Sequence, residues 1–584
     1  MAQWAAEITA ADRVSARISN LRLLTAAAAV ATAAPIIRGS LDAWWLAMPA
    51  AVFLGLVVWH SRLTDRTEQA RRRQAWYERG LARIAGTWAG TGPDGKRFLE
   101  GNLFAADLDL FGPGSLFQLL DTARTEAGEA TLADWLRTGA APAEIRARQA
   151  AIAELAPAIE FRESVAVTAS AASSRTSGLL KWASRPDAGF PRGIGIVFAV
   201  LGISTTGLLL AAYNGLVDGR LFVLSLVIQL ATIARFFRPA AESLLHVDNA
   251  ARDLTLLQAV LERIETHPYT SPRLVELRAS LRPAGAADDT PPSQRIQQLI
   301  RLITWLDSTR NQIFAPIALL LMIQFVLAAA IDRWHAKHAT AITAWLDAVG
   351  EMEAFSALAT YAYEHPADPF PEIEEAGPLF EAAGLGHPLI PEGTAIRNDV
   401  AFGGHHPHLL LVSGSNMSGK STLLRAIGVN VVLGLAGAPV RATALRLSPL
   451  TLGTSLRIED SLQAGHSRFY AEILRIRAIV ELTRTSSSVV FLLDEMLAGT
   501  NSHDRKIGAE AIIRSLVAHG AFGLVTTHDL ALADVVPTLG ALATNVHFED
   551  RIEDGKMIFD YRMREGVVTH SNALALMRAI GLDV

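Results

Sequence analysis

Nine consecutive residues combine two glycines, a lysine and several hydroxyl side chains in an order that can bind phosphate. They are Gly414, Ser415, Asn416, Met417, Ser418, Gly419, Lys420, Ser421 and Thr422. In such a loop, successive backbone N–H groups and the positive end of the following helix hold the β-phosphate of a nucleotide. Lys420 would reach the β- and γ-phosphates, and the Ser421 hydroxyl would be a ligand of Mg²⁺. The pattern predicts a nucleotide-binding loop.

The flanking residues supply the elements that such a loop needs. Residues 409–412 are continuously apolar, as in a buried strand, and residues 422–427 have helical spacing. The predicted order is strand, tight loop and helix. The alternative is a chance glycine turn before a helix, which the motifs that follow along the chain disfavour.

Two acidic residues end a second apolar run. Residues 489–493 predict a central parallel strand, and Asp494 and Glu495 follow at its carboxyl end, where open α/β sheets bind ligands. Asp494 could hold Mg²⁺ through water, and Glu495 could orient or deprotonate the attacking water. The alternative is a pair of surface acids that cap the next helix.

A third strand is predicted at residues 522–527, and it ends at His528. A histidine at this position could sense the γ-phosphate, although a lone histidine at a strand end is more often incidental. Together the three sites predict an ATPase that uses ATP and Mg²⁺, with Lys420, Glu495 and His528 as its catalytic residues.

The residues around these motifs show a family resemblance. The loop with Asn416 to Ser418 inside it, residues 494–504 and residues 526–529 are together similar to the ATPase domain of the MutS mismatch-repair family. Residues 464–472 resemble the signature loop of that family, whose serine, here Ser467, reaches across a dimer to the partner's nucleotide. The resemblance makes residues 499–504 the link between two composite sites, and therefore implies a homodimer.

Other segments resemble further parts of the same family. Residues 386–390 and Asn398 match the segment that leads to the adenine pocket, although Ala395 and Ile396 stand where an aromatic residue is common. Alternation around residues 554–555 predicts a β-hairpin. Residues 566–577 resemble the closing helix of the family.

Composition sets limits on the whole chain. It has 584 residues, half of them apolar, no cysteine and a net charge of −5. Its mean hydropathy of +0.26 is too high for a wholly soluble protein. The length suggests several domains, the missing cysteines exclude a disulfide framework, and the charge gives no global nucleic-acid signal. A role on DNA therefore rests on the resemblance.

Four apolar runs predict membrane spans. Residues 23–37 and 44–59 form one pair, and residues 194–213 and 221–234 form another. Arginines follow each pair, at positions 62, 66, 71, 72 and 73 and at 235 and 238. By the positive-inside rule both hairpins have their ends in the cytoplasm. The prediction is a multi-pass protein of the inner (cytoplasmic) membrane with a cytoplasmic ATPase domain; the alternative for the first pair is a buried core hairpin.

A fifth apolar run, residues 313–331, is also long enough to span. A fifth span would put the nucleotide-binding loop outside the cell, where ATP is scarce, and basic residues flank both ends of the run. We therefore predict a buried or interfacial helix. The alternative is a true span, with one of the other four wrongly assigned.

The predicted fold is an α/β P-loop ATPase domain of the ABC and MutS kind, preceded by a helical MutS-like core that transmembrane hairpins interrupt. The predicted segments are a first membrane hairpin (1–75), helical core (76–190), a second membrane hairpin (191–238), core and lever (239–375) and the ATPase domain (376–584). The mismatch-reading and connector domains of repair proteins have no visible counterpart in this sequence.

The resemblance implies an ATPase that closes as a dimeric clamp on DNA, in the manner of mismatch repair or DNA damage sensing, and the apolar runs predict that it is anchored in the membrane. One alternative is an ABC-like transporter with fused spans, although the usual Leu-Ser-Gly-Gly-Gln signature is missing. Another is a nucleotide-controlled membrane scaffold that does not bind DNA.

Overall fold

The computed structural model describes residues 2–169, 177–245, 247–282, 289–311, 314–375, 377–457, 468–486, 488–553 and 556–568. The chain separates into two compact units. One comprises residues 1–88 and 163–171, and the other comprises residues 89–162 and 172–584. Ser467 and most of the predicted closing helix, residues 569–577, lie outside the described residues. The domain boundaries given above stay predictions.

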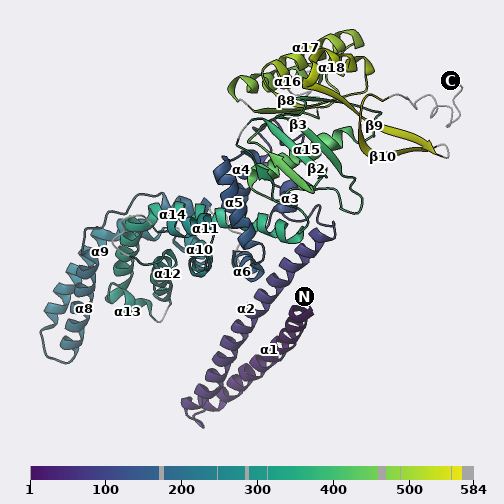
Figure 1. The fold of residues 1–584 in the computed structure, drawn as a ribbon. Helices are drawn as coiled ribbons and strands as arrows, with labels where there is room; N and C mark the ends of the chain where they lie inside the picture. The colour runs from purple at the N-terminus through teal and green to yellow at the C-terminus, as the bar shows by residue number, and fades with distance from the viewer. Residues whose placement is uncertain are drawn as a thin grey trace. The chain divides into compact units, whose positions relative to one another are not determined.

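The first unit is built on a pair of long antiparallel helices, α1 (Ala2–Ile37) and α2 (Ala47–Ile84), joined through the short 3₁₀ helix η1 (Ala43–Leu46) (Figure 1). Arg71 Nη2 of α2 donates to Asp12 Oδ1 of α1 at 3.0 Å. The side chains of the two apolar runs are mostly exposed, including Leu23, Val30 and Leu54. A soluble protein rarely exposes apolar surface on this scale.

The second unit begins with helices that lead to one long helix, α14 (Ile323–Glu364). Side-chain caps start three of the described ones: Ser115 accepts from the Gln118 N–H at α3, Thr125 from the Gly128 N–H at α4, and Asp218 from the Arg220 N–H at α9. The helices before α14 are α3 (Leu116–Leu120), α4 (Glu126–Arg137), α5 (Pro142–Leu155), α7 (Ser177–Ala183), α8 (Ile194–Tyr213), α9 (Gly219–Leu244), α10 (Val247–Thr266), α11 (Pro272–Ser280), α12 (Pro292–Ser308) and α13 (Ala315–Leu320). Helix α6 (Ile159–Ala169) divides between the two units.

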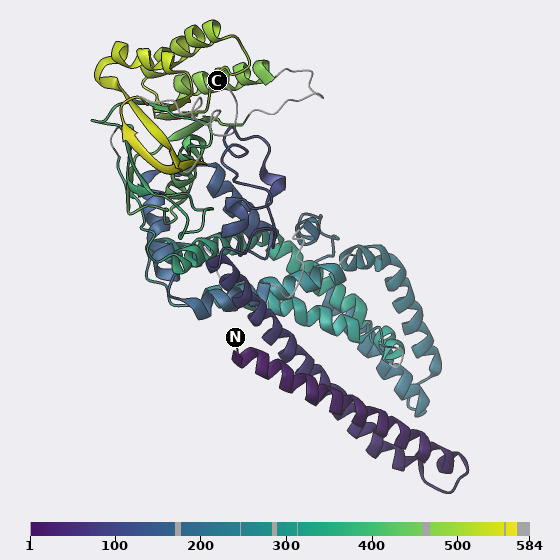
Figure 2. The ribbon, with the colours of Figure 1, turned by 90° about the vertical axis from the view of Figure 1, so that its right-hand side faces the viewer.

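Helices α8 and α9 form a hairpin (Figures 1 and 2) that packs against α14, and α8 also contacts α13. Within the described residues, four helical segments are long and apolar enough to cross a membrane. They are α1 from Trp4 onward, α2 together with η1 from Trp44 onward, α8, and α9. The fifth apolar run is not a single helix. It divides between α13 and the start of α14, because Met322 between them has a left-handed φ of 54°.

The C-terminal part contains two sheets. The smaller has the strand order β1 (Glu372–Ile373), β5 (Ala444–Leu447), β2 (Leu379–Leu385) and β3 (Asn398–Gly403). The larger has the order β10 (Lys556–Glu565), β9 (Ala543–Glu553), β4 (Leu409–Ser413), β8 (Phe522–Thr527), β7 (Val489–Leu493) and β6 (Thr451–Ser455). Strands β9, β4, β8, β7 and β6 are parallel, and β10 is antiparallel to β9. The three strands and the hairpin expected from the sequence are confirmed.

Helices cover both faces of the larger sheet, which buries its central strands completely. Alternate residues such as Leu411 and Phe491 pack with α16 (Arg468–Thr485) and α17 (Ser502–Ala518). On the other face, Leu492 lies against Gly428 of α15 (Lys420–Ala436). A strand buried on both faces has no polar alternation, which is why these strands are continuous apolar runs in the sequence. The remaining short helices are η2 (Lys96–Phe98), η3 (Leu530–Asp534), α18 (Val535–Leu539) and η4 (Gly540–Leu542).

Candidate nucleotide-binding site

The glycine-rich loop lies between the carboxyl end of β4 and the amino end of α15. Gly419 has a left-handed φ of 104° directly before the helix. A Cβ atom there would lie 3.1 Å from Cδ1 of Tyr561, so both the backbone conformation and the available space favour glycine. Gly414 is also tightly enclosed, since a Cβ atom would lie 2.9 Å from the Ser418 Oγ.

Lys420 is the first residue of α15, and its side chain folds back over the loop. It is 4% exposed, and its Nζ donates to the carbonyl oxygens of Gly414 at 2.9 Å and Ser415 at 2.8 Å. The same nitrogen lies 3.8 Å from Glu495 Oε1. Burial lowers the pKa of Lys420, while the charges of Glu495 and Asp494 oppose that shift. The ammonium group is therefore fixed between the loop and the acidic pair.

Asp494 and Glu495 are held at the end of β7 by a residue of the neighbouring strand. The hydroxyl of Thr526 on β8 donates to Asp494 Oδ1 and accepts from the Glu495 N–H at 3.1 Å. Asp494 N donates to the Ser455 carbonyl on β6 at 2.9 Å. Glu495 has a left-handed φ of 47°, an uncommon conformation for a non-glycine residue. Sequence reasoning gave Thr526 no role of its own, although it stands two residues before His528.

His528 lies directly against Glu495, with Nδ1 3.5 Å from Glu495 Oε1. Its Nε2 is 3.5 Å from Nη1 of Arg505, which also donates to the Thr500 carbonyl at 3.1 Å. An Arg505 N–H that points at Nε2 leaves the ring proton on Nδ1, where it faces Glu495. Arg505 is a second residue that sequence reasoning missed, because an arginine in the first turn of a helix has no distinctive pattern.

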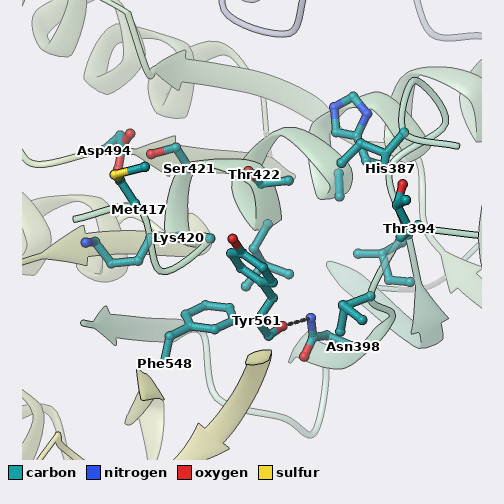
Figure 3. A pocket seen from close by; sticks show the side chains of 18 of the residues that line it. His387, Thr394, Asn398, Met417, Lys420, Ser421, Thr422, Asp494, Phe548 and Tyr561 are labelled. Atoms are coloured by element: carbon teal, nitrogen blue, oxygen red, sulfur yellow. Dashed lines mark hydrogen bonds between the residues drawn. The ribbon is translucent and has the colours of Figure 1, made fainter. Parts of the chain in front are cut away.

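The predicted residues meet around one cavity of about 580 Å³, a size suited to a small-molecule ligand (Figure 3). The loop, the acidic pair, β10 and the segment before β3 all contribute to its wall. Its polar lining includes Asn416, Lys420, Ser421, Thr422, Asp494, Glu495 and Asn398. His528 is not part of this lining and lies behind Glu495.

A family model described as MutS domain V matches residues 410–583 of the chain. The C-terminal part of this chain is therefore similar to domain V of the MutS family. It is 29% identical over 251 residues to the DNA mismatch repair protein MutS of Brevibacillus brevis, covering 42% of this chain and 28% of that protein. It is 32% identical over 245 residues to Endonuclease MutS2 of Thermus thermophilus, covering 41% and 30%.

A third relative is the probable DNA mismatch repair protein Msh6 of Drosophila melanogaster, 27% identical over 314 residues, which are 51% of this chain and 25% of that protein. The chain thus spans less than a third of the length of each of these MutS relatives.

Two aromatic residues line the cavity of the MutS domain from a direction that sequence reasoning did not anticipate. Phe548 comes from β9, and Tyr561 comes from β10, where its φ is 55°. Asn398 holds this hairpin in place: its Nδ2 donates to the Tyr561 carbonyl at 3.0 Å, and its Oδ1 accepts from the Met563 N–H at 2.8 Å. The predicted nucleotide contact of Asn398 stays a prediction, and its visible contacts are with β10.

His387 forms part of the wall beside the segment before β3. It is buried, and its Nδ1 accepts from the Leu389 N–H at 3.2 Å. Burial, with a contribution from the charge of Arg425, lowers the pKa of His387 to about 4. The ring is therefore neutral at pH 7 and adds no charge to the cavity.

The signature loop of the MutS domain is described only from Arg468 onward, so the predicted role of Ser467 stays a prediction. At the end of this segment, Glu472 Oε1 accepts from the Leu497 N–H at 2.5 Å. Helix α16 is thereby linked to the turn that follows the acidic pair. At the end of that turn, Asn501 caps α17 by accepting from the Asp504 N–H at 2.9 Å.

Proposed function

We propose that residues 376–584 form a P-loop ATPase domain that binds and hydrolyses ATP with Mg²⁺. The observation that supports this most directly is the meeting of Lys420, Ser421, Asp494 and Glu495 in one cavity, although they come from two segments about 75 residues apart. The match of residues 410–583 to MutS domain V also supports it.

The side chains present fit a Mg²⁺ ion that is shared with the nucleotide. Ser421 and Asp494 offer hard oxygen donors on one wall of the cavity. Within the described part of the chain, no cluster of three or more His, Asp or Glu side chains could hold a metal alone. Phosphate oxygens and water would complete the coordination, and the bound ion would neutralise charge on the phosphates.

The remaining side chains have separate roles in this proposal. Lys420 neutralises charge on the β- and γ-phosphates, and the backbone of residues 414–419 encloses the β-phosphate. Glu495 orients the attacking water and accepts its proton, with His528 Nδ1 and Thr526 fixing its position. Tyr561 packs against the adenine base, replacing the aromatic residue that is absent before Asn398.

We further propose that α1 with α2 and α8 with α9 anchor the protein in the inner (cytoplasmic) membrane as two hairpins. Their exposed apolar side chains and the arginines that follow each pair support this arrangement. The ATPase domain then lies in the cytoplasm, where ATP is available.

We propose as the physiological activity an ATP-dependent homodimeric clamp on DNA, close to mismatch repair, with Ser467 completing the partner's site. The names of the relatives, DNA mismatch repair protein among them, support this step. The second candidate is a nucleotide-controlled membrane scaffold without DNA binding. The packing of α14 against α8, which joins the core to a predicted span, favours this alternative.

ATP turnover by the detergent-purified chain, with and without DNA duplexes, tests the choice between the two. The duplexes should include a homoduplex and a mismatched one, across a salt series, because contacts to DNA phosphates weaken as salt increases. If the protein is a DNA clamp, DNA should stimulate ATP turnover, and this stimulation should decrease as salt increases. ATP turnover that DNA does not change at low salt would contradict the clamp and favour the scaffold.

A further inference from the structure

The fifth apolar run has an unusual form in the structure. From Phe314 to Ile331 it contains no charged side chain, and Gln324 is its only side chain with an amide or hydroxyl group. Its first helix, α13, has six residues and is about 9 Å long at 1.5 Å per residue, far too short to cross a bilayer. After Met322 the chain enters α14, and the Gln324 Nε2 donates to the Thr309 hydroxyl at the end of α12 at 3.3 Å, so the run comes back to the point where it left α12.

The turn packs against α8 at unusually close range. A Cβ atom on Gly202 would lie 2.4 Å from the Leu321 carbonyl oxygen, so only glycine permits this approach. One turn away along α8, the ring centroids of Phe198 and Phe325 lie 5.7 Å apart. Small residues that let backbones approach are characteristic of helix packing within membranes.

Helix α9 satisfies the backbone that the turn leaves open. The buried Gln229 Nε2 donates to the carbonyl oxygens of Leu319 at 3.3 Å and Leu320 at 3.0 Å. These carbonyls end α13. The carbonyl of Leu319 also accepts from the Met322 N–H at 3.1 Å, whereas the left-handed Met322 prevents a continuous helix from using that of Leu320. Irregular backbone at membrane depth is tolerated only where protein groups satisfy it, and Gln229 does this.

The depth of the turn follows from the register of the hairpin. The ring of Phe198 meets that of Phe236 at 5.5 Å, next to Arg235, the first charged residue along α9 after the tip region. Gly202 is four residues beyond Phe198, or about 6 Å along the helix axis, and Gln229 is six residues from Arg235, or about 9 Å. Both distances are less than the roughly 15 Å of one hydrocarbon leaflet.

Resting on the membrane anchoring proposed above, we propose that residues 314–331 form a re-entrant wedge in the cytoplasmic leaflet. The wedge enters beside α8 and α9, turns at Met322 and returns to the cytoplasmic side. Its partners are lipid acyl chains, which contact Ile317 and Leu319, 51% and 55% exposed. The exposed apolar side chains of α8 and α9 continue the same surface, and Arg310 and Arg333 flank the wedge on its cytoplasmic side.

The cysteine-free chain allows a direct test with single cysteines. A spin label is placed at Ile317 or Leu319 in the full-length protein in phospholipid vesicles, and its collisions with oxygen and with a water-soluble nickel complex are compared. Two exposed apolar positions are matched controls: Val227 on α9, 57% exposed, and Ile507 on α17, 56% exposed. If the wedge is correct, the spin labels at 317, 319 and 227 collide often with oxygen and rarely with the nickel complex. The label at 507 collides often with the nickel complex.

The controls separate the two proposals. If the label at 227 also meets nickel, the membrane anchoring itself is wrong. If 227 is protected while 317 and 319 meet nickel, the anchoring stands and the wedge is wrong.

A second measurement distinguishes the wedge from a full span. Cysteines replacing Ser308 and Ala336, both exposed, are treated with a membrane-impermeant maleimide in inside-out and right-side-out vesicles. The wedge predicts that both react from the cytoplasmic side only. Reaction from opposite sides would overturn it in favour of a span.

Discussion

The hydroxyl of Thr526 contacts both acidic residues at the end of β7, since it donates to Asp494 and accepts from the Glu495 N–H. Replacing it with Val in Thr526→Val removes the hydroxyl and keeps the β-branched shape. We expect ATP turnover to fall about tenfold, equivalent to about 1.4 kcal/mol in the barrier, while ATP binding changes little. Thr451→Val is the control, because it removes a hydroxyl from β6 at the opposite end of the sheet. Equal turnover in both variants would contradict a positioning role for Thr526.

Variants of Tyr561 test whether the adenine base of ATP binds where we propose. Stacking of a base on an aromatic side chain contributes about 1–3 kcal/mol, so Tyr561→Ala should raise the Kd for ATP about tenfold or more. Tyr561→Phe keeps the ring and should bind ATP almost normally. Isothermal titration with both variants measures this difference. An unchanged Kd in Tyr561→Ala would place the base elsewhere in the cavity.

At the scale of elements, the joint between α4 and α14 contains buried carboxyl groups. Burial, reinforced by the charge of Glu129, raises the pKa of Asp121 to about 8. Burial also raises the pKa of Glu353 to about 7, although Glu353 accepts hydrogen bonds from the N–H groups of Arg124 and Thr125. A carboxyl group whose pKa is raised by folding binds more protons in the folded state than in the unfolded state.

The stability of this joint should therefore decrease as pH rises from about 4 to about 8. In Asp121→Asn the side chain no longer titrates, so the decrease in Tm across this range should be smaller than in the wild type. Thermal unfolding of the two detergent-purified proteins at pH 5 to 8 measures this decrease in Tm. Parallel curves for the two proteins would show that Asp121 titrates normally.

Gln229 joins two other elements, α9 and α13. In Gln229→Leu, the carbonyl of Leu320 loses its donor in an apolar environment, at a cost of about 1–3 kcal/mol, whereas the carbonyl of Leu319 keeps the Met322 N–H. We expect a lower Tm than in Thr232→Val, which removes a hydroxyl that bonds only to its own helix. A Tm equal to that control would mean that the Leu320 carbonyl does not depend on Gln229.

At the scale of the whole molecule, the sequence allowed us to predict those features that depend on neighbouring residues in the chain. The strands β4 and β7 were visible as apolar runs, because both of their faces are covered. The glycine-rich loop and the acidic pair were visible because their chemistry depends on neighbouring residues. Contacts between distant segments were not visible: Asn398 meets Tyr561 across 163 positions, and no pattern near either residue indicates the pairing.

The path of the fifth apolar run also depends on contacts with distant segments, and the local sequence did not predict it. Its length and flanking charges allowed a buried helix, an interfacial helix or a span. The break depends on Gly202 and Gln229, which lie on other helices about 90 to 120 residues earlier. Tertiary packing, rather than the composition of the run, sets its path.

In the proposed mechanism, Glu495 serves ATP hydrolysis in a site shared with Lys420, Ser421 and Asp494. The most direct measurement compares ATP turnover and ATP binding by Glu495→Gln with those of Glu510→Gln, a change at a half-exposed position on α17. We expect Glu495→Gln to bind ATP and to lose turnover by about a hundredfold or more, while Glu510→Gln behaves as the wild type. Undiminished hydrolysis by Glu495→Gln would contradict the account.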